Sequence, residues 1–164
     1  MKKFTIQTIF LVIIIFLALG VATSKISTNF SFLPQVQKET IKEIKINNTI
    51  LQIEVADTKE KRSKGLGGRE VLASNSGMLF IFPKEDKYSF WMKGLKFPID
   101  IIWIRKNIVV DIIRNAKHPE KNQKDEILPT YLPREQVDMV LEVNGGFVDS
   151  HDMKINNTIE IINQ

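Results

Sequence analysis

Short stretches of alternating or continuous apolar residues make up most of the chain after its first forty residues. In TILQIEVAD, residues 49–57, apolar side chains such as Leu51 and Ile53 alternate with mostly polar ones, which is the period of a strand with one buried face. Short apolar runs bounded by turn formers predict strands buried on both faces at residues 77–82 and 99–104. Further strands are predicted after residue 107 and at residues 137–144 and 158–162.

Helical signals are few. Asp57 or Thr58 is placed to cap a short helix over residues 59–64, and Gly65 would end it with the positive φ that glycine adopts cheaply. A further helical turn is predicted within residues 145–153. Parallel crossovers would need longer helices than these. The sequence therefore predicts a mainly β domain, an antiparallel β sandwich or barrel that is jelly-roll-like, with one or two short helices.

The N-terminus has a different pattern, MKK followed by a largely apolar run over residues 4–22. A transmembrane helix needs ~20 apolar residues and a secretory signal ~7 to 15, so residues 1–22 are read as a membrane anchor or a signal peptide. The lysines before the run predict that the rest of the chain lies outside the cytoplasm. The protein would be a single-pass membrane protein, or it would be secreted or periplasmic if the leader is cleaved. Residues 23–40 predict a flexible spacer, and residues 41–164 a single β-rich domain.

Composition removes several classes of function. The chain has no cysteine, which excludes thiol catalysis, disulfides and cysteine-ligated zinc. Of 23 basic and 19 acidic residues, Lys2 and Lys3 belong to the leader, which leaves a net charge of +2 and predicts no nucleic-acid partner. Neither His118 nor His151 has a second ligand at the spacing of a zinc motif, so no metal or cofactor is predicted. No serine lies in a nucleophile motif, and the catalytic residues stay unassigned.

The apolar stretch FWMKGLKFPIDIIWI, residues 90–104, keeps three charged residues and is the strongest candidate for a site. In a strand that ends at Lys93, Trp91 and Lys93 share one face, so an indole lies beside an ammonium group. That pair suits stacking combined with charge recognition. The irregular segment at residues 115–133 exceeds the usual length of a structureless loop, which is typical of a binding loop or lid.

Asp100 begins a predicted strand whose other residues are all apolar. An unpaired buried carboxylate costs several kcal/mol, so we expect Asp100 to have a partner. Lys93, Arg69 and Arg62 are the charged candidates, and the alternative is a set of backbone N–H groups in the bend at residues 94–98. Four carboxylates in or beside strands could also converge on a calcium site or an acid/base pair, namely Asp57, Asp100, Asp111 and Glu142. Sequence spacing alone does not show whether they meet.

Four blocks in this order resemble the uncharacterised bacterial and archaeal family of domain of unknown function 192. They are VADTKEKRSKGLGGRE, GMLFIF, FWMKGLKFPIDIIWI and VLEVNGG. The chain departs from the family at Gly67, where methionine is usual, at Gly94-Leu95, where Asn-Thr is usual, and at Asn156-Asn157, where Gly-Asp is common. The resemblance implies a mainly β, sandwich-like domain that is often exported or membrane-tethered, and it supplies no function and no catalytic residue.

Three functional hypotheses follow. The first is a non-catalytic binding module outside the cytoplasmic membrane for a small anionic, sugar-like or peptide ligand, with ligand-binding residues Arg62, Arg69, Trp91, Lys93 and Asp100. The second is a hydrolase-type enzyme with Asp100 as acid or base and Lys93 or Arg69 stabilising charge. The third is a structural or assembly protein of the cell envelope, with an exposed apolar patch for a partner protein.

Overall fold

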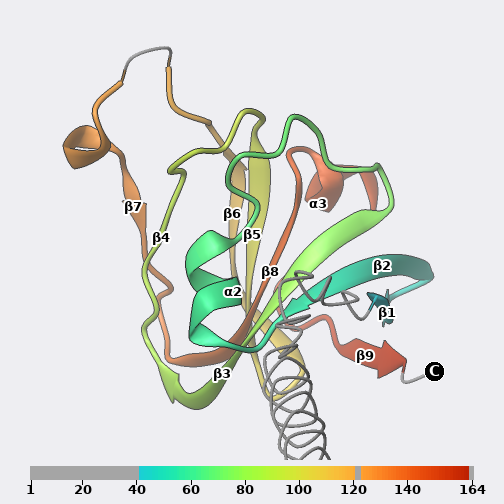
Figure 1. Ribbon diagram of the computed structural model, residues 1–164. Coiled ribbons are helices and arrows are strands. Elements are labelled where there is room, and N and C mark those ends of the chain that lie inside the picture. Colours follow the sequence, from blue (N-terminus) through green and yellow to red (C-terminus); the bar gives the residue numbers. More distant parts are fainter. Residues whose placement is uncertain (1–40, 121–122, 163–164) are drawn as a thin grey trace, which may run out of the picture. The chain divides into compact units, whose positions relative to one another are not determined.

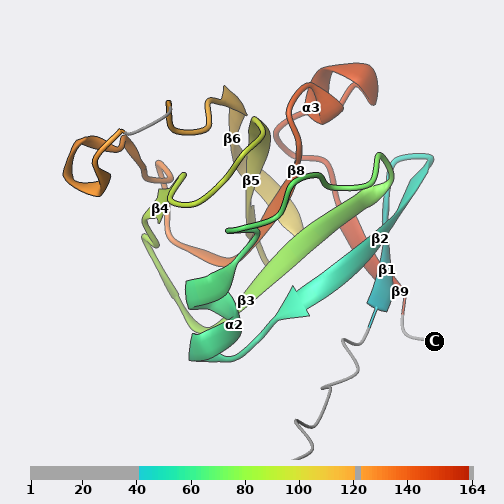
Figure 2. The ribbon, with the colours of Figure 1, turned by 45° about the horizontal axis from the view of Figure 1, so that its top comes forward.

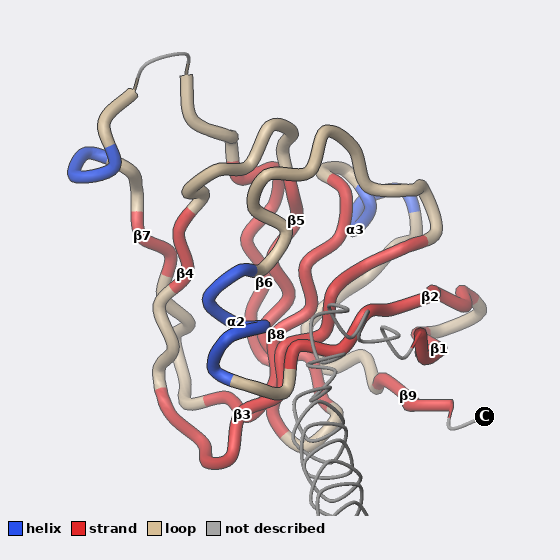
Figure 3. Tube along the Cα trace, in the orientation of Figure 1, coloured by secondary structure: helices blue, strands red, loops and turns tan. Residues whose placement is uncertain are grey.

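Strands are the main regular elements of the described chain (Figure 3). The computed structural model describes residues 41–120 and 123–162. Its strands are β1 (Ile41–Ile46), β2 (Thr49–Ala56), β3 (Ser76–Asp86), β4 (Phe90–Trp91), β5 (Ile99–Arg105), β6 (Ile108–Ala116), β7 (Thr130–Tyr131), β8 (Val137–Asn144) and β9 (Ile159–Ile162), and its helices are α2 (Lys59–Lys64), α3 (Phe147–Ser150) and the 3-10 turn η1 (Asp125–Ile127). The predicted leader at residues 1–22 and spacer at residues 23–40 lie outside this range. Within it, no helix is long and apolar enough to span a bilayer.

Seven strands form one mixed sheet in the order β6-β5-β8-β3-β2-β1-β9, and β4 pairs with β7 in a separate ribbon. The sheet curls until its two edges approach each other (Figures 1 and 2). Ile108 at the start of β6 bridges Thr158 just before β9, and the Val109 N–H donates to Asn157 O at 2.9 Å. The mainly β prediction is confirmed, and the architecture is a strongly curled half-barrel.

The pairing of β2 with β3 is parallel, whereas the sequence predicted an antiparallel sheet. It sets Ile53 opposite Gly77 and Ala56 opposite Phe80. The prediction was wrong because it assumed that a parallel crossover needs a long helix. A crossover needs only enough residues to return the chain to the same end of the sheet. Residues 57–75 supply that length with α2 and an irregular loop.

Side chains on opposite faces of the sheet belong to two separate cores. The first includes Ile44, Leu51, Leu79, Ile102, Leu141, Val143, Phe147 and Ile159. The second includes Leu66, Phe80, Met92, Ile101, Trp103 and Val140, so the turn after α2 and the loop after β4 help to cover that face. β5 contributes to both cores, as its continuous apolar run predicts.

Asp100 is fully buried at the start of β5 and accepts three backbone hydrogen bonds. Its Oδ1 accepts the N–H groups of Asn115 at 2.7 Å and Gly146 at 3.2 Å, and its Oδ2 accepts the Val148 N–H at 2.8 Å. Gly146 is the N-cap of α3, so the carboxylate holds the start of that helix against the sheet. Backbone N–H groups, the alternative partners predicted for Asp100, are therefore confirmed. The donors do not, however, come from the bend at residues 94–98.

The expected pairing of Asp100 with Lys93, Arg69 or Arg62 was wrong. Asp100 lies opposite Val143 in the β5–β8 register, and Val143 belongs to the first core. Since side chains alternate between the two faces of a strand, Asp100 points away from the face that α2 covers.

Asp100→Asn is expected to destabilise the fold by about 2 to 4 kcal/mol, because an amide cannot satisfy three N–H donors as a carboxylate does. Urea unfolding measures the change. Asp138→Asn is the matched control, because its carboxylate accepts only an exposed bond from the Lys106 N–H, and we expect it to cost less than about 1 kcal/mol. Equal losses in the two variants would contradict the assigned role.

Candidate ligand-binding site

The α2 helix and the turn after it form one wall of a hollow above the sheet. Thr58 caps the helix, since its Oγ1 accepts the Lys61 N–H at 3.2 Å, and Gly65 ends it with a φ of 51°. The turn then reaches the loop after β4, where the Gly68 N–H donates to Gly94 O at 2.8 Å. The cap and stop signals in the sequence are confirmed, and the turn encloses a space between the helix and this loop.

We call this space the α2 hollow. It encloses about 50 Å³, which is room for roughly three to five water-sized groups. Its lining includes Arg62, Lys64, Gly67, Trp91, Lys93 and Glu142. The hollow therefore admits the end group of a ligand and leaves the rest of that ligand outside.

Glu142 lines the α2 hollow from the central strand β8 and is 4% exposed. Its neighbours across the sheet are Met78 of β3 and Ile101 of β5, both apolar. Within the described residues, no hydrogen bond or ion pair engages its carboxyl group. Burial raises the pKa of Glu142 to about 8. At neutral pH this side chain is therefore mostly a neutral acid with one O–H to donate.

Arg62 of α2 is held rigidly at the edge of the α2 hollow. Its Nη1 donates to Asp57 O at 2.7 Å and to Ile81 O at 2.8 Å, and its guanidinium carbon lies 5.2 Å from the Phe82 ring centroid. Within the described residues, its Nε and Nη2 have no recorded acceptor. These N–H groups are available to a ligand, and no ion pair of Arg62 is recorded among the described residues.

Trp91 and Lys93 lie together, although the strand predicted to end at Lys93 ends at Trp91 and Lys93 lies in the turn after it. The Lys93 ammonium lies 5.1 Å from the Trp91 ring centroid, and it also forms an ion pair with Asp125 at 2.6 Å. Asp125 belongs to η1 within the long segment at residues 115–133, whose strand β7 pairs with β4. The η1 turn and β7 therefore lie close to β4, and Trp91 stays 52% exposed.

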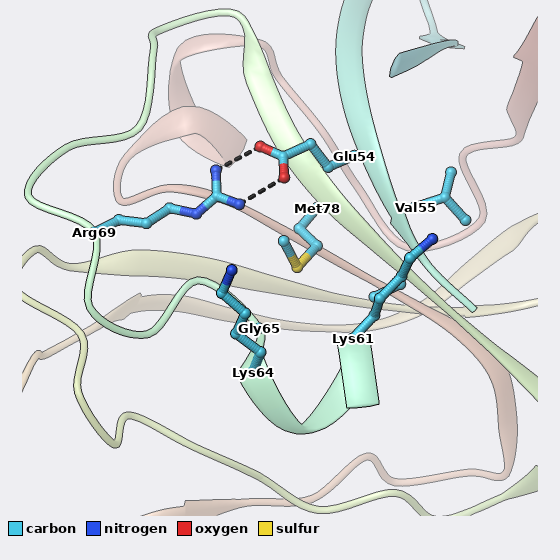
Figure 4. Close-up of a pocket in the computed structure, with 8 residues that line it drawn as sticks. Glu54, Val55, Lys61, Lys64, Gly65, Arg69 and Met78 are labelled. Carbon is cyan, nitrogen blue, oxygen red and sulfur yellow. Dashed lines mark hydrogen bonds and ion pairs between the residues drawn. The ribbon is translucent and has the colours of Figure 1, made fainter. Parts of the chain in front are cut away.

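Arg69 occupies a second, smaller hollow of about 40 Å³ beside α2 (Figure 4). Its two terminal nitrogens donate to the two carboxylate oxygens of Glu54 in a bidentate pair. Glu54 lies opposite Met78, which in turn lies opposite Glu142, so two carboxyl groups flank one methionine on the same face of the sheet. Glu54 has a cation bound to it, and Glu142 has none among the described residues.

The structure thus divides the five residues that sequence reasoning selected. Arg62, Trp91 and Lys93 line the α2 hollow, Arg69 lines the second hollow, and Asp100 lines neither of the two. Sequence reasoning named Glu142 only as one of four carboxylates and did not select Lys64. The signal for Glu142 was a single acid within an otherwise apolar strand. Among the described residues, no three histidine or acidic side chains gather closely enough to hold a metal ion.

Two departures from the family pattern meet at the wall of the α2 hollow. A methyl group added at Gly94, where φ is 70°, would lie 3.7 Å from the Cα of Gly67. One added at Gly67 would lie 3.1 Å from Lys64 O. Glycine at position 94 allows the positive φ of the loop after β4, and glycine at position 67 lets the turn after α2 pass close to Lys64 O. The substitutions therefore belong to one local arrangement.

Comparisons with known proteins support the fold. Residues 41–161 match the model of the DUF192 family, described as "Uncharacterized ACR". A "putative transcription regulator" from Sinorhizobium meliloti 1021 is similar in structure, with a TM-score of 0.65, 26% identity and coverage of 73% of this chain and 92% of that one. A protein of unknown function from Novosphingobium aromaticivorans DSM 12444 has a TM-score of 0.67, 25% identity and coverage of 77% and 89%. No match was found among curated proteins.

Glu142→Gln is expected to change how stability depends on pH. The folded-state pKa of Glu142, about 8, lies above the ordinary value of 4.5, so this residue's contribution to stability is present at low pH and is lost as pH rises towards and through 8. Glutamine stays neutral and avoids this loss. At about pH 9 the variant should be more stable than the parent by a few kcal/mol, on the order of 3.

Urea unfolding at about pH 5 and about pH 9 measures this difference. Glu160→Gln on β9 is the matched control, because Glu160 is exposed and its replacement should leave the pH dependence of the parent. A constant difference between the parent and Glu142→Gln at both pH values would contradict the buried, neutral state of Glu142.

Proposed function

We propose that this chain, which belongs to the DUF192 family, is a non-catalytic binding module that takes the anionic end group of a small ligand in the α2 hollow. The observation that carries the proposal is the combination of cationic side chains with an exposed indole around one small cavity. We also propose that residues 4–22 hold this module on the outer side of the cytoplasmic membrane.

The charges around the α2 hollow favour an anion. Arg62, Lys64 and Lys93 line it, and its one acid, Glu142, is neutral at neutral pH. Lys64 has no recorded ion pair within the described residues, and Arg62 keeps N–H groups free of recorded acceptors. A cationic ligand would meet like charges on several sides, whereas an oxyanion could accept charge-assisted hydrogen bonds.

The size and rim of the α2 hollow define the rest of the ligand. About 50 Å³ holds a carboxylate or a group of similar size. The remainder would lie against the half-exposed Trp91 ring, which offers a flat apolar surface to another ring. These features support a carboxylate attached to an aromatic or sugar-like ring.

The placement of Asp100 favours binding over the hydrolase hypothesis. Its carboxylate is fully buried and engaged by backbone N–H groups, so it has no open path to a substrate.

The description of the Sinorhizobium protein as a regulator is not extended to this chain, because the charge outside the leader is only +2 and no basic stripe accompanies it. The envelope-assembly hypothesis stays a prediction.

Benzoate is a suitable probe, and benzylamine is its cationic counterpart of similar shape. We expect full-length protein in detergent to bind benzoate weakly and benzylamine not at all, as measured by calorimetry. Trp91→Ala and Lys64→Gln should each weaken benzoate binding by about fivefold, which corresponds to ~1 kcal/mol. Lys154→Gln, whose ammonium pairs with Asp152 on the exposed surface, is the control and should bind as the parent does. Equal binding of both probes, or no effect of either variant, would contradict the proposal.

The proposed location has its own test. Protease added to intact spheroplasts should cleave the domain at residues 41–164 while a cytoplasmic marker protein stays whole, because the proteolytic sites would face outward. Resistance in intact spheroplasts, followed by cleavage after lysis, would place the domain inside the cytoplasm.

A further inference from the structure

We propose that the anion of the α2 hollow binds together with a proton on Glu142, whose neutral carboxyl group donates a hydrogen bond to an anionic oxygen of the ligand. This inference rests on the proposed function and deepens it. It assigns the proton as a second ligand of the same site and gives the site a ligand class, the carboxylates.

The carboxyl group of Glu142 has no partner among its neighbours in the sheet, so a partner would have to come from the α2 hollow. On either side in the sheet it meets Met78 and Ile101, whose side chains offer no oxygen or nitrogen acceptor. Beyond Met78 the carboxylate of Glu54 is already bound by Arg69. The acid is more than nine-tenths buried, lines the hollow, and has no recorded partner within the described residues. A nearly buried polar group without a protein partner costs free energy that a ligand can recover.

None of the cationic side chains described around the α2 hollow is recorded as a bonding partner of Glu142. Arg62 directs its Nη1 to two carbonyl oxygens, and Lys93 lies over the Trp91 ring and forms an ion pair with Asp125. Lys64 is exposed on α2. The charged groups that face Glu142 from α2 and from the loop after β4 are therefore positive, yet none is recorded as bonded to it.

The protonation state of Glu142 then decides whether an anion is attracted. The neutral acid adds an O–H donor beside Arg62 and Lys64, and an O–H···O⁻ bond is stronger than one between neutral groups. The ionised form loses that donor and places a negative charge against the ligand at short range. Burial raises the pKa of Glu142 to about 8, so the donor form predominates at neutral pH. Binding should weaken as pH rises above this value.

A carboxylate fits this donor set better than a larger oxyanion. Its three heavy atoms suit a cavity of about 50 Å³. One oxygen can accept the Glu142 O–H while the other accepts N–H groups from Arg62 or Lys64, which is the usual two-oxygen recognition of a carboxylate.

The test is the pH dependence of benzoate affinity, because benzoate stays ionised between about pH 6.5 and about pH 9.5. The parent full-length protein should lose about tenfold in affinity across this range, mostly above about pH 8. Glu142→Gln should bind within about threefold of the parent at pH ~6.5 and show no such step, because its amide donates at every pH. Glu160→Gln, an exposed site, should keep the step.

A second measurement counts protons directly. At about pH 8.5, calorimetry in buffers of different ionisation enthalpy should show uptake of up to about one proton per benzoate bound by the parent, and none by Glu142→Gln. Thermal unfolding of each variant, recorded in the same buffers, shows that it is folded.

The outcomes separate the two proposals. Binding with the same pH profile in the parent and in Glu142→Gln, without proton uptake, would overturn the role of Glu142 and leave the binding function standing. A folded Glu142→Gln variant that no longer binds at about pH 6.5 would also overturn the neutral-donor role. Failure of the parent to bind benzoate at every pH would reject both proposals.

Discussion

The alternation of side chains along β5 and β8 decides which face of the sheet each buried acid reaches. Asp100 lies opposite Val143, and the next pair along the ladder sets Ile101 opposite Glu142. Directly opposed residues in an antiparallel pair share a face, so the two acids point in opposite directions although they lie in neighbouring pairs. The same pleat therefore gives the sheet two buried carboxyl groups in two different environments.

The two environments lead to different roles. Asp100 meets the N–H groups at the start of α3 and at Asn115, which satisfy a carboxylate and fix the chain at the end of the sheet. Glu142 meets apolar neighbours and a small space under a helix of only six residues. If that space were closed, Glu142 would be an unpaired acid in a sealed core. The short helix and its glycine turn therefore preserve an opening where the sheet carries an unsatisfied group.

Sequence patterns predicted what depends on neighbours in the chain. The period of residues 49–57 and the apolar run at residues 99–104 predicted their strands. The contact of Lys93 with Trp91 was predicted from a shared strand, but Lys93 makes it from the turn after β4. The donors to Asp100 were beyond such reasoning, because Asn115 and Gly146 reach it only when the sheet is assembled. The surroundings of Glu142 depend in the same way on the return of the chain after α2, which also made β2 and β3 parallel.

The proton on Glu142 affects both the stability of the fold and the proposed binding of a ligand. In the free protein, burial removes the water that would solvate an ionised carboxylate. Glu142 therefore keeps its proton at neutral pH. In the complex that we propose, a bound carboxylate gives that proton a second oxygen to interact with, so the ligand and the proton each make the other bind more tightly, by the same factor. A ligand that binds only the folded, protonated form also stabilises the fold. Under this proposal the same acid weakens the empty domain at alkaline pH and provides the selectivity of the occupied one, which is a physical reason for a fold to retain it where an apolar residue would pack better.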